Sequence, residues 1–141
     1  PPRRVYISRQ DAVERQTPNE AEVMRSLSLF GFERVMIGQM PVKESIEILA
    51  SASTVVVPHG SGGANLLFAP PGSSVVEIDD IRQDWLIHGT ALVLDQPYRL
   101  IGRVPAEKRA RGGNEKFGPA VNVAELETAV EWATSAEAKR T

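Results

Sequence analysis

The chain has 141 residues, a formal net charge of −2 and no cysteine. This length suits one domain with a buried core, and the charge excludes broad binding to nucleic acid or to an anionic membrane, which requires a strongly basic face. The lack of cysteine excludes a disulfide framework and thiolate metal sites. No apolar run reaches the roughly 20 residues that span a bilayer.

The first predicted elements are a strand over 4–8 and a helix that begins at Thr17. Threonine is a favoured N-cap, Pro18 suits the first helical position, and Glu20 completes a capping box with Thr17. Gly31 supplies the stop signal at the end of this helix. Because the capping box explains Glu20, we expect it to stabilise the helix more than to contact a ligand.

The rest of the chain repeats this alternation of apolar runs and amphipathic stretches. In chain order the pattern predicts a strand at 34–37, a helix from Pro41, a strand at 54–57, a helix at 64–68, a strand at 74–78, a helix at 84–94, a strand at 98–101 and a helix capped by Asn122. Residues 103–119 are rich in glycine and charge, which predicts a mobile loop. The polar tail 135–141 is expected to fray.

Apolar strands that alternate with helices predict an α/β fold, a Rossmann-like doubly wound parallel sheet of about five or six strands. We expect residues 1–141 to form one domain. The chain enters its first strand almost at once, which favours a C-terminal domain excised from a longer protein. In such a sheet ligands bind beyond the carboxyl ends of the strands, so the loops that leave these ends form the candidate site.

The loop after the third predicted strand has the clearest binding signal, and it reads His59-Gly60-Ser61-Gly62-Gly63-Ala64-Asn65. Glycine lets the backbone approach a ligand closely with its N–H groups directed outward. The helix that follows adds its positive end. The loop therefore predicts a phosphate or pyrophosphate site, with His59 and Ser61 as side-chain donors. A tight turn without a ligand is the alternative.

Other candidate contacts lie near strand ends. Ser8 and Arg9 follow the first strand and lie beside the glycine loop if the strand order is the usual one. The planar fork of arginine suits a diphosphate, and Arg15 is close enough in sequence to contribute, although solvated arginines are the alternative. Asn19 is a candidate contact to ribose or base. Glu77 is a candidate ribose contact or a salt-bridge partner.

Several catalytic patterns are absent from the sequence. There is no P-loop and no G-x-G-x-x-G after the first strand, and His59 replaces the first glycine of a G-x-S-x-G elbow. An esterase-like hydrolase that uses His59-Gly60-Ser61-Gly62 as an oxyanion loop is a third-ranked possibility. The two histidines, His59 and His88, are far apart, so no metal site is predicted. No residue stands out as a catalytic base.

An ordered set of short motifs runs through the first part of the chain: Tyr6-Ile7-Ser8-Arg9, Arg15, Asn19-Glu20, Gly31-Phe32-Glu33, and His59-Gly60 through Asn65-Leu66-Leu67-Phe68. This set resembles glycosyltransferase family 61, also met as capsular polysaccharide biosynthesis proteins. The family commonly has H-G-A-G-L in the glycine loop, whereas this chain has Ser61 and Gly63 at the third and fifth positions. That departure leaves the identity of the donor open.

The resemblance implies one half of a GT-B architecture, with a missing N-terminal domain of the same protein as partner. It implies transfer of a sugar from a nucleoside-diphosphate donor, usually a UDP-sugar, to a glycan acceptor, without a cofactor or an obligatory metal. By position, Ser8, Arg9 and the 59–65 loop would hold the diphosphate and the donor sugar. The isolated chain would then be an incomplete enzyme, and a non-catalytic nucleotide-binding module is the alternative. The implied location is the cytoplasm, or the inner-membrane surface if the rest of the protein binds there.

Overall fold

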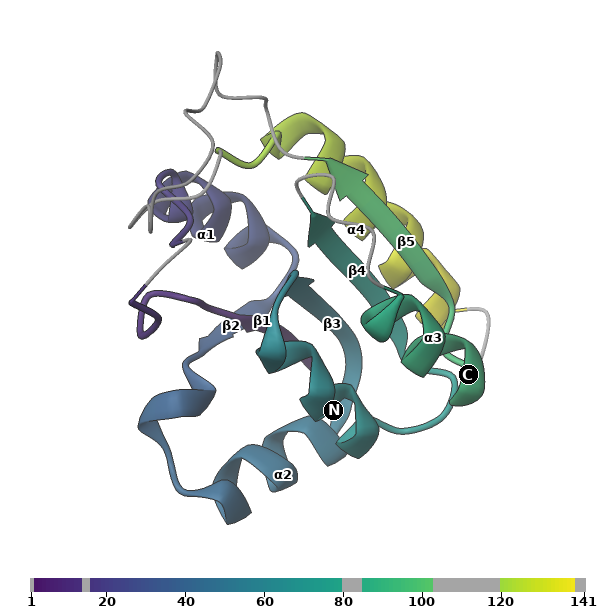
Figure 1. Ribbon diagram of the computed structural model, residues 1–141. Helices are drawn as coiled ribbons and strands as arrows, with labels where there is room; N and C mark the ends of the chain where they lie inside the picture. The colour runs from purple at the N-terminus through teal and green to yellow at the C-terminus, as the bar shows by residue number, and fades with distance from the viewer. Residues whose placement is uncertain (1, 14–15, 80–84, 103–119, 139–141) are drawn as a thin grey trace.

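The computed structural model describes residues 2–13, 16–79, 85–102 and 120–138. All strands among them run parallel in one five-stranded sheet of order β2-β1-β3-β4-β5. The strands are β1 (Arg3–Ile7), β2 (Phe32–Val35), β3 (Ala52–Pro58), β4 (Ser74–Asp79) and β5 (Tyr98–Gly102). Helices cover both faces of this sheet (Figure 1), which confirms the predicted α/β, Rossmann-like fold.

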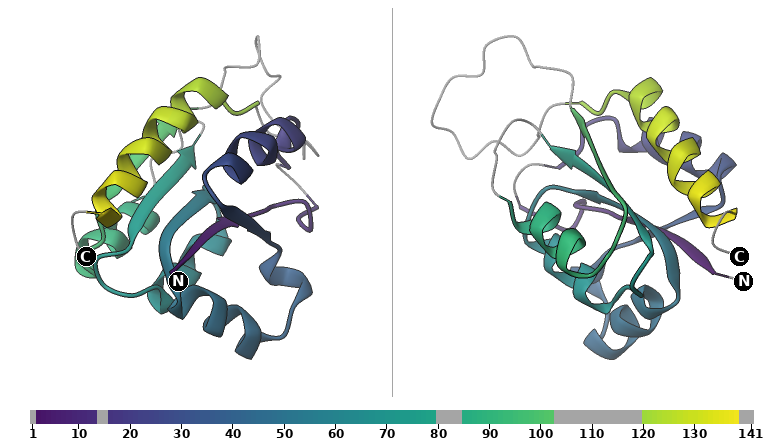
Figure 2. Two further views of the ribbon diagram at one scale, coloured as in Figure 1. Left: turned by 180° about the vertical axis from the view of Figure 1, so that it is seen from behind. Right: turned by 90° about the vertical axis from the view of Figure 1, so that its right-hand side faces the viewer.

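Two groups of helices cover the sheet, one on each face (Figures 1 and 2). One face carries α1 (Glu20–Leu29) and α4 (Val123–Ala138), whose buried side chains share a core with Tyr6, Val56 and Val76. The other face carries α2 (Val42–Ala50), α3 (Leu86–Val93) and the 3-10 helix η2 (Ser61–Phe68), which pack on Val5, Val55 and Val75. Strand residues alternate between the two cores because successive side chains point to opposite faces.

The chain reverses its winding direction between β1 and β3. From β1 it passes through α1 to β2 on one side, and from β2 it returns through the short 3-10 helix η1 (Ile37–Gln39) and α2 to β3 on the other side of β1. Such a reversal opens a crevice at the carboxyl ends of the two strands, where ligands of open α/β sheets bind. The strand order therefore places β1 and β3 side by side, as the sequence analysis required.

Several predicted boundaries differ from those in the structure, most clearly the second strand and the end of the last helix. The second strand is Phe32–Val35 and not 34–37, because Gly31 adopts a φ of +76° and turns the chain directly into the strand after α1. Residues 37–39 then form η1. The last helix extends to Ala138, four residues into the segment expected to fray, while 139–141 and the predicted loop 103–119 lie outside the described residues.

The predicted capping box at Thr17 does not form. Helix α1 begins at Glu20 and its N-cap is Asn19, whose side chain makes no capping hydrogen bond to the helix backbone and instead donates to the Glu22 carboxylate. Glu20 instead turns into the protein, where Tyr6 and Ser8 donate hydrogen bonds to it. The second predicted cap is confirmed, because Asn122 Oδ1 accepts the Glu125 N–H at the start of α4.

Among the helices that the structure describes, none has the length and apolar character needed to cross a membrane.

Candidate functional site

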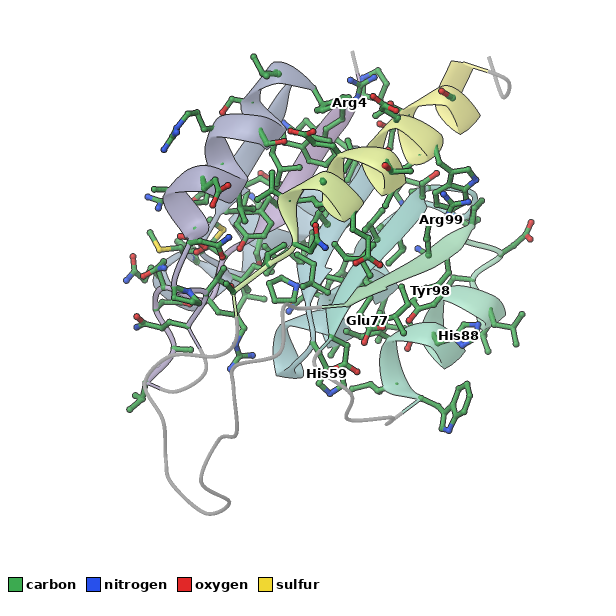
Figure 3. The ribbon with its side chains drawn as sticks, turned by 90° about the horizontal axis from the view of Figure 1, so that it is seen from above. Arg4, His59, Glu77, His88, Tyr98 and Arg99 are labelled. Atoms are coloured by element: carbon green, nitrogen blue, oxygen red, sulfur yellow. The ribbon has the colours of Figure 1, made fainter. Side chains whose placement is uncertain are left out.

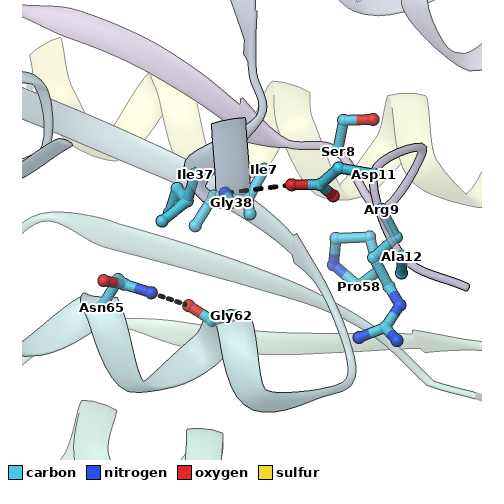
Figure 4. Close-up of a pocket in the computed structure, with 10 residues that line it drawn as sticks. All are labelled: Ile7, Ser8, Arg9, Asp11, Ala12, Ile37, Gly38, Pro58, Gly62 and Asn65. Carbon is cyan, nitrogen blue, oxygen red and sulfur yellow. Dashed lines mark hydrogen bonds between the residues drawn. The ribbon is translucent and has the colours of Figure 1, made fainter. Parts of the chain in front are cut away.

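A cavity of about 320 Å³ opens at the carboxyl ends of β1 and β3, at the reversal point of the sheet (Figure 4). Binding pockets for small molecules span roughly 300–1,000 Å³, so the cavity is large enough to hold part of a nucleotide-sugar. Its walls come from the β1–α1 loop, from η1, from the end of β3 and from η2. The lining residues are Ile7, Ser8, Arg9, Asp11, Ala12, Ile37, Gly38, Pro58, Gly62 and Asn65.

The cavity brings together the two loops that the sequence analysis singled out. Ser8 and Arg9 come from the loop after β1, whereas Gly62 and Asn65 come from the glycine loop after β3. The guanidinium of Arg9 lies directly over Gly60, so that a Cβ atom at Gly60 would collide with Nη1 of Arg9. The arginine and the glycine loop thus form one continuous wall.

The glycine loop is already helical at Ser61, three residues before the predicted helix start. The Gly63 N–H donates to the Gly60 carbonyl, and the Asn65 amide donates to the Gly62 carbonyl at 3.0 Å. Asn65 therefore holds the turn closed from within the cavity wall. The N–H groups of Ser61 and Gly62 precede this first bond and have no acceptor within the helix, so the turn can offer them to an anion.

Gly63, the fifth residue of the loop motif, faces the neighbouring helix. A Cβ atom at this position would collide with the side chain of Ile87, which is fully buried in α3. Gly63 consequently provides the close contact between η2 and α3, and its predicted role as a ligand contact remains a prediction.

Asp11 is a cavity residue that the sequence analysis did not identify. Its Oδ2 accepts the Gly38 N–H at 2.9 Å, and this bond joins the β1–α1 loop to η1 (Figure 4). A Cβ atom at Gly38 would press on the same oxygen, so glycine is what allows the carboxylate to lie against this amide. No pattern around Asp11 or Gly38 indicated that the two would meet.

Ser8 lies at the end of β1 and is 3% exposed. Its hydroxyl donates to Glu20 Oε1 at 2.6 Å and accepts the Gln10 N–H at 3.1 Å. Glu20 is also buried, and Tyr6 and Arg34 donate to its two oxygens. Ser8 is thus part of the network that fixes the loop carrying Arg9 and Asp11, while its predicted contact with a diphosphate remains a prediction.

His59 turns away from this cavity, although its neighbour Pro58 lines it. Nδ1 of His59 lies 2.9 Å from Glu77 Oε1, and Tyr98 donates to Glu77 Oε2 at 2.8 Å (Figure 3). Glu77 is 2% exposed and both of its oxygens have partners within the protein. Glu77 is thus held by hydrogen bonds within the protein, and its predicted contact with ribose remains a prediction.

The same cluster holds donor atoms for a metal ion. His59, Glu77 and Asp79 each place one donor atom within 4.8 Å of the others. A nitrogen and two carboxylate oxygens are ligands that divalent cations accept, and the expectation of no metal did not anticipate this group.

Tyr98, which contacts Glu77 in this cluster, stays protonated. Burial and, second, the hydrogen bond to Glu77 raise the pKa of Tyr98 above its ordinary value, so the phenol remains a donor. The His88 ring stacks on the Tyr98 ring, with 4.4 Å between the ring centroids.

Asn19 links the two ends of the fold. Its Nδ2 donates to the Val121 carbonyl and its Oδ1 accepts the Val121 N–H, both at 2.9 Å. This pair of bonds connects the start of α1 to the segment before α4. The predicted contact of Asn19 with ribose or base remains untested, and Arg15 and the Ser61 side chain lie outside what the structure describes.

Replacing Asn19 by alanine is expected to lower the free energy of unfolding by about 1–2 kcal/mol, because two backbone groups lose their partners. Urea denaturation measures this loss. Asn19→Asp keeps the acceptor for the Val121 N–H but sets a carboxylate oxygen against the Val121 carbonyl and the Glu22 carboxylate, so we expect this variant to lose stability as well. Equal stability of wild type and Asn19→Ala would contradict the proposed link.

Comparison with known families identifies the family of this chain. The family model described as Glycosyltransferase 61 matches residues 1–76, more than half of the 141 residues. The chain belongs to the glycosyltransferase 61 family. It is therefore a glycosyltransferase, an enzyme that moves a glycosyl group from a donor to an acceptor. This assignment replaces the esterase-like hypothesis. All lining residues of the cavity lie inside the matched segment of this family 61 chain. No curated protein matches the chain.

Proposed function

We propose that this family 61 chain binds a nucleoside-diphosphate sugar, with a UDP-sugar as the favoured donor, in the cavity between β1 and β3. The observation that carries the proposal is the common wall of Arg9 and the glycine loop at the reversal point of the sheet. A guanidinium and backbone amides are the groups that bind diphosphates most often in such folds. In this proposal the transferred sugar is used for polysaccharide or glycan synthesis.

The chemistry of glycosyl transfer fits these groups. When the bond between the sugar and the diphosphate breaks, negative charge develops on the leaving diphosphate. Fixed N–H donors and a guanidinium stabilise that charge without reorganising, because the fold already holds them in place. Arg9 and the first turn of η2 supply such donors side by side, because the guanidinium lies against Gly60, the residue just before η2.

The remaining components are part of the proposal and come from the family resemblance. They are a GT-B arrangement with a second Rossmann-like domain of the same protein, a glycan acceptor, and a reaction in the cytoplasm or at the inner-membrane surface. The acceptor site and the catalytic base would lie largely on that second domain. We therefore expect this chain to bind the donor and to turn it over slowly on its own.

A calorimetry and thermal-shift panel of UDP, GDP, CMP and NAD tests the donor site. A ligand at about 100 times its Kd adds about 2.7 kcal/mol of stability, which raises the Tm of a protein of this size by several degrees. We expect one nucleoside diphosphate to give this shift, and Arg9→Ala to weaken its binding roughly tenfold or more, since hydrogen bonds to charged groups contribute about 1.5–3 kcal/mol.

The matched control is Arg25→Ala, which removes the same charge from an exposed position on α1. It should leave the affinity for the nucleotide unchanged. An equal loss in both variants would indicate a general effect of net charge and not a contact at the cavity. Failure of every nucleotide to bind the wild type would contradict the proposed donor site.

A further inference from the structure

Two oppositely charged side chains enter the cavity from one short loop. Arg9 and Asp11 both belong to the segment after β1, but they lie against different walls. Arg9 covers Gly60 in the β3–η2 loop, whereas Asp11 accepts the Gly38 N–H in η1, after β2. Each charge is seated on a glycine that leaves room for it. The cavity therefore has one cationic wall and one anionic wall (Figure 4).

This division of charge restricts how a donor can lie in the cavity. A diphosphate is attracted to Arg9 and to the N–H groups of η2 and is repelled by the Asp11 carboxylate. An ionised carboxylate can only accept hydrogen bonds, so its natural partner on a nucleotide-sugar is a hydroxyl group. The ribose and the transferred sugar both carry such hydroxyls.

We propose that Asp11 is a specificity-determining residue that accepts a hydrogen bond from a sugar hydroxyl of the donor. The inference rests on the proposed function, because it takes the diphosphate to lie at Arg9. Gly38 is the positioning residue: its N–H holds Oδ2 of Asp11 and its lack of a side chain leaves space for that oxygen. Ile7 and Ile37 also line this cavity, and their apolar side chains offer no hydrogen bond to a ligand. A ligand hydroxyl on this side of the cavity would therefore find its acceptor at the Asp11 carboxylate.

The test compares ligands that carry phosphate alone with ligands that also carry a sugar. Calorimetry on the whole chain measures the affinities of pyrophosphate, UDP, UDP-glucose, UDP-N-acetylglucosamine and UDP-xylose for the wild type and for Asp11→Asn. Asparagine keeps an oxygen that can accept the Gly38 N–H, so we expect the fold to persist, and a melting curve checks this. The control is Glu44→Gln, which removes an acidic charge from an exposed position on α2.

We expect Asp11→Asn to affect the two kinds of ligand differently. Pyrophosphate should bind equally well or more tightly, because a repelling charge is gone. Binding of the sugar-containing ligand should weaken roughly tenfold or more, since the hydrogen bond to a charged acceptor is lost. A loss for UDP itself assigns the hydroxyl to ribose, and a loss for a UDP-sugar with UDP unchanged assigns it to the transferred sugar.

Gly38→Ala provides an independent arm. It displaces the carboxylate and retains its charge, so the sugar-containing ligand should weaken as in Asp11→Asn while pyrophosphate does not gain affinity. Unchanged affinities for UDP and all UDP-sugars in Asp11→Asn, with Arg9→Ala still weakening UDP, would overturn this inference alone. If no ligand of the set binds the wild type, the proposed donor site fails and the role of Asp11 fails with it.

Discussion

Gly60→Ala is expected to weaken the binding of a nucleoside diphosphate roughly tenfold or more, although it removes no charged group. The Cβ atom of alanine would collide with the guanidinium of Arg9, which lies over Gly60. Gly60 also has a φ of +151°, a backbone conformation that residues with a side chain rarely adopt. Arg9 must therefore leave its position, and the cationic wall of the cavity is lost. Calorimetry with UDP and with pyrophosphate measures the change.

Two further variants separate a local effect from a general one. Gly89 lies in α3 with nothing within 4 Å of an added Cβ atom, so Gly89→Ala should retain both stability and affinity. In the double variant Arg9→Ala/Gly60→Ala, the second substitution should add little, because both act on the same guanidinium. Full nucleotide affinity in a folded Gly60→Ala protein would show that the position of Arg9 is irrelevant to binding.

Gly63→Leu is expected to reduce the free energy of unfolding by about 3 kcal/mol, the upper range for forcing extra atoms into a packed core. Leucine is the residue that family 61 commonly has at this point of the loop. Here the space belongs to Ile87, which is 0% exposed and packs directly on Gly63. Ile87→Ala alone should also cost about 2–5 kcal/mol, because it leaves a cavity in the core.

The double variant Gly63→Leu/Ile87→Ala decides whether the two residues share one space. We expect it to lose less stability than the sum of the single variants, since the leucine can enter the volume that isoleucine vacates. Urea denaturation of the four proteins measures the coupling. Strictly additive losses would mean that the η2–α3 contact does not explain the glycine in this chain.

Much of the fold could be predicted because its signals are local. The apolar strand runs, Gly31 after α1 and Asn122 before α4 each act within a few residues, and the alternation of strands and helices then implies a parallel sheet. The meeting of Arg9 with the glycine loop followed from the same logic, because neighbouring parallel strands end at one edge. These parts needed no knowledge of side-chain packing.

The capping box failed because a tertiary contact outweighed a local preference. Thr17, Pro18 and Glu20 together are a strong N-terminal signal, yet Glu20 is drawn inward by hydrogen bonds from Tyr6 and Ser8. Tyr6 lies on β1 and Ser8 directly follows it, so both partners are more than ten positions away along the chain. A local sequence pattern contains no information about partners this far away, so the predicted start of α1 and the predicted role of Glu20 were both wrong.

The remaining site residues depend on register and on loop geometry. The register of β3 and β4 pairs Val57 with Glu77. His59 comes two positions after Val57, and its side chain therefore lies against the Glu77 carboxylate and not in the cavity. Strand periodicity fixes which face a residue takes, but not which partner lies opposite. The pairing of Asp11 with Gly38 likewise depends on η1, whose three residues carry no helical pattern.

The parallel sheet and the position of α4 also determine how the chain can reach its native state. Parallel strands cannot pair through short hairpins, so every strand pair must wait for an intervening crossover, and such distant pairings slow folding. The face of the sheet that carries Tyr6, Val56 and Val76 is covered by α1 and α4 together, and α4 begins only at Val123. A nascent chain that has emerged only as far as β4 would therefore leave part of this apolar face uncovered. Until α4 is made, that exposed surface would favour aggregation or the binding of a chaperone.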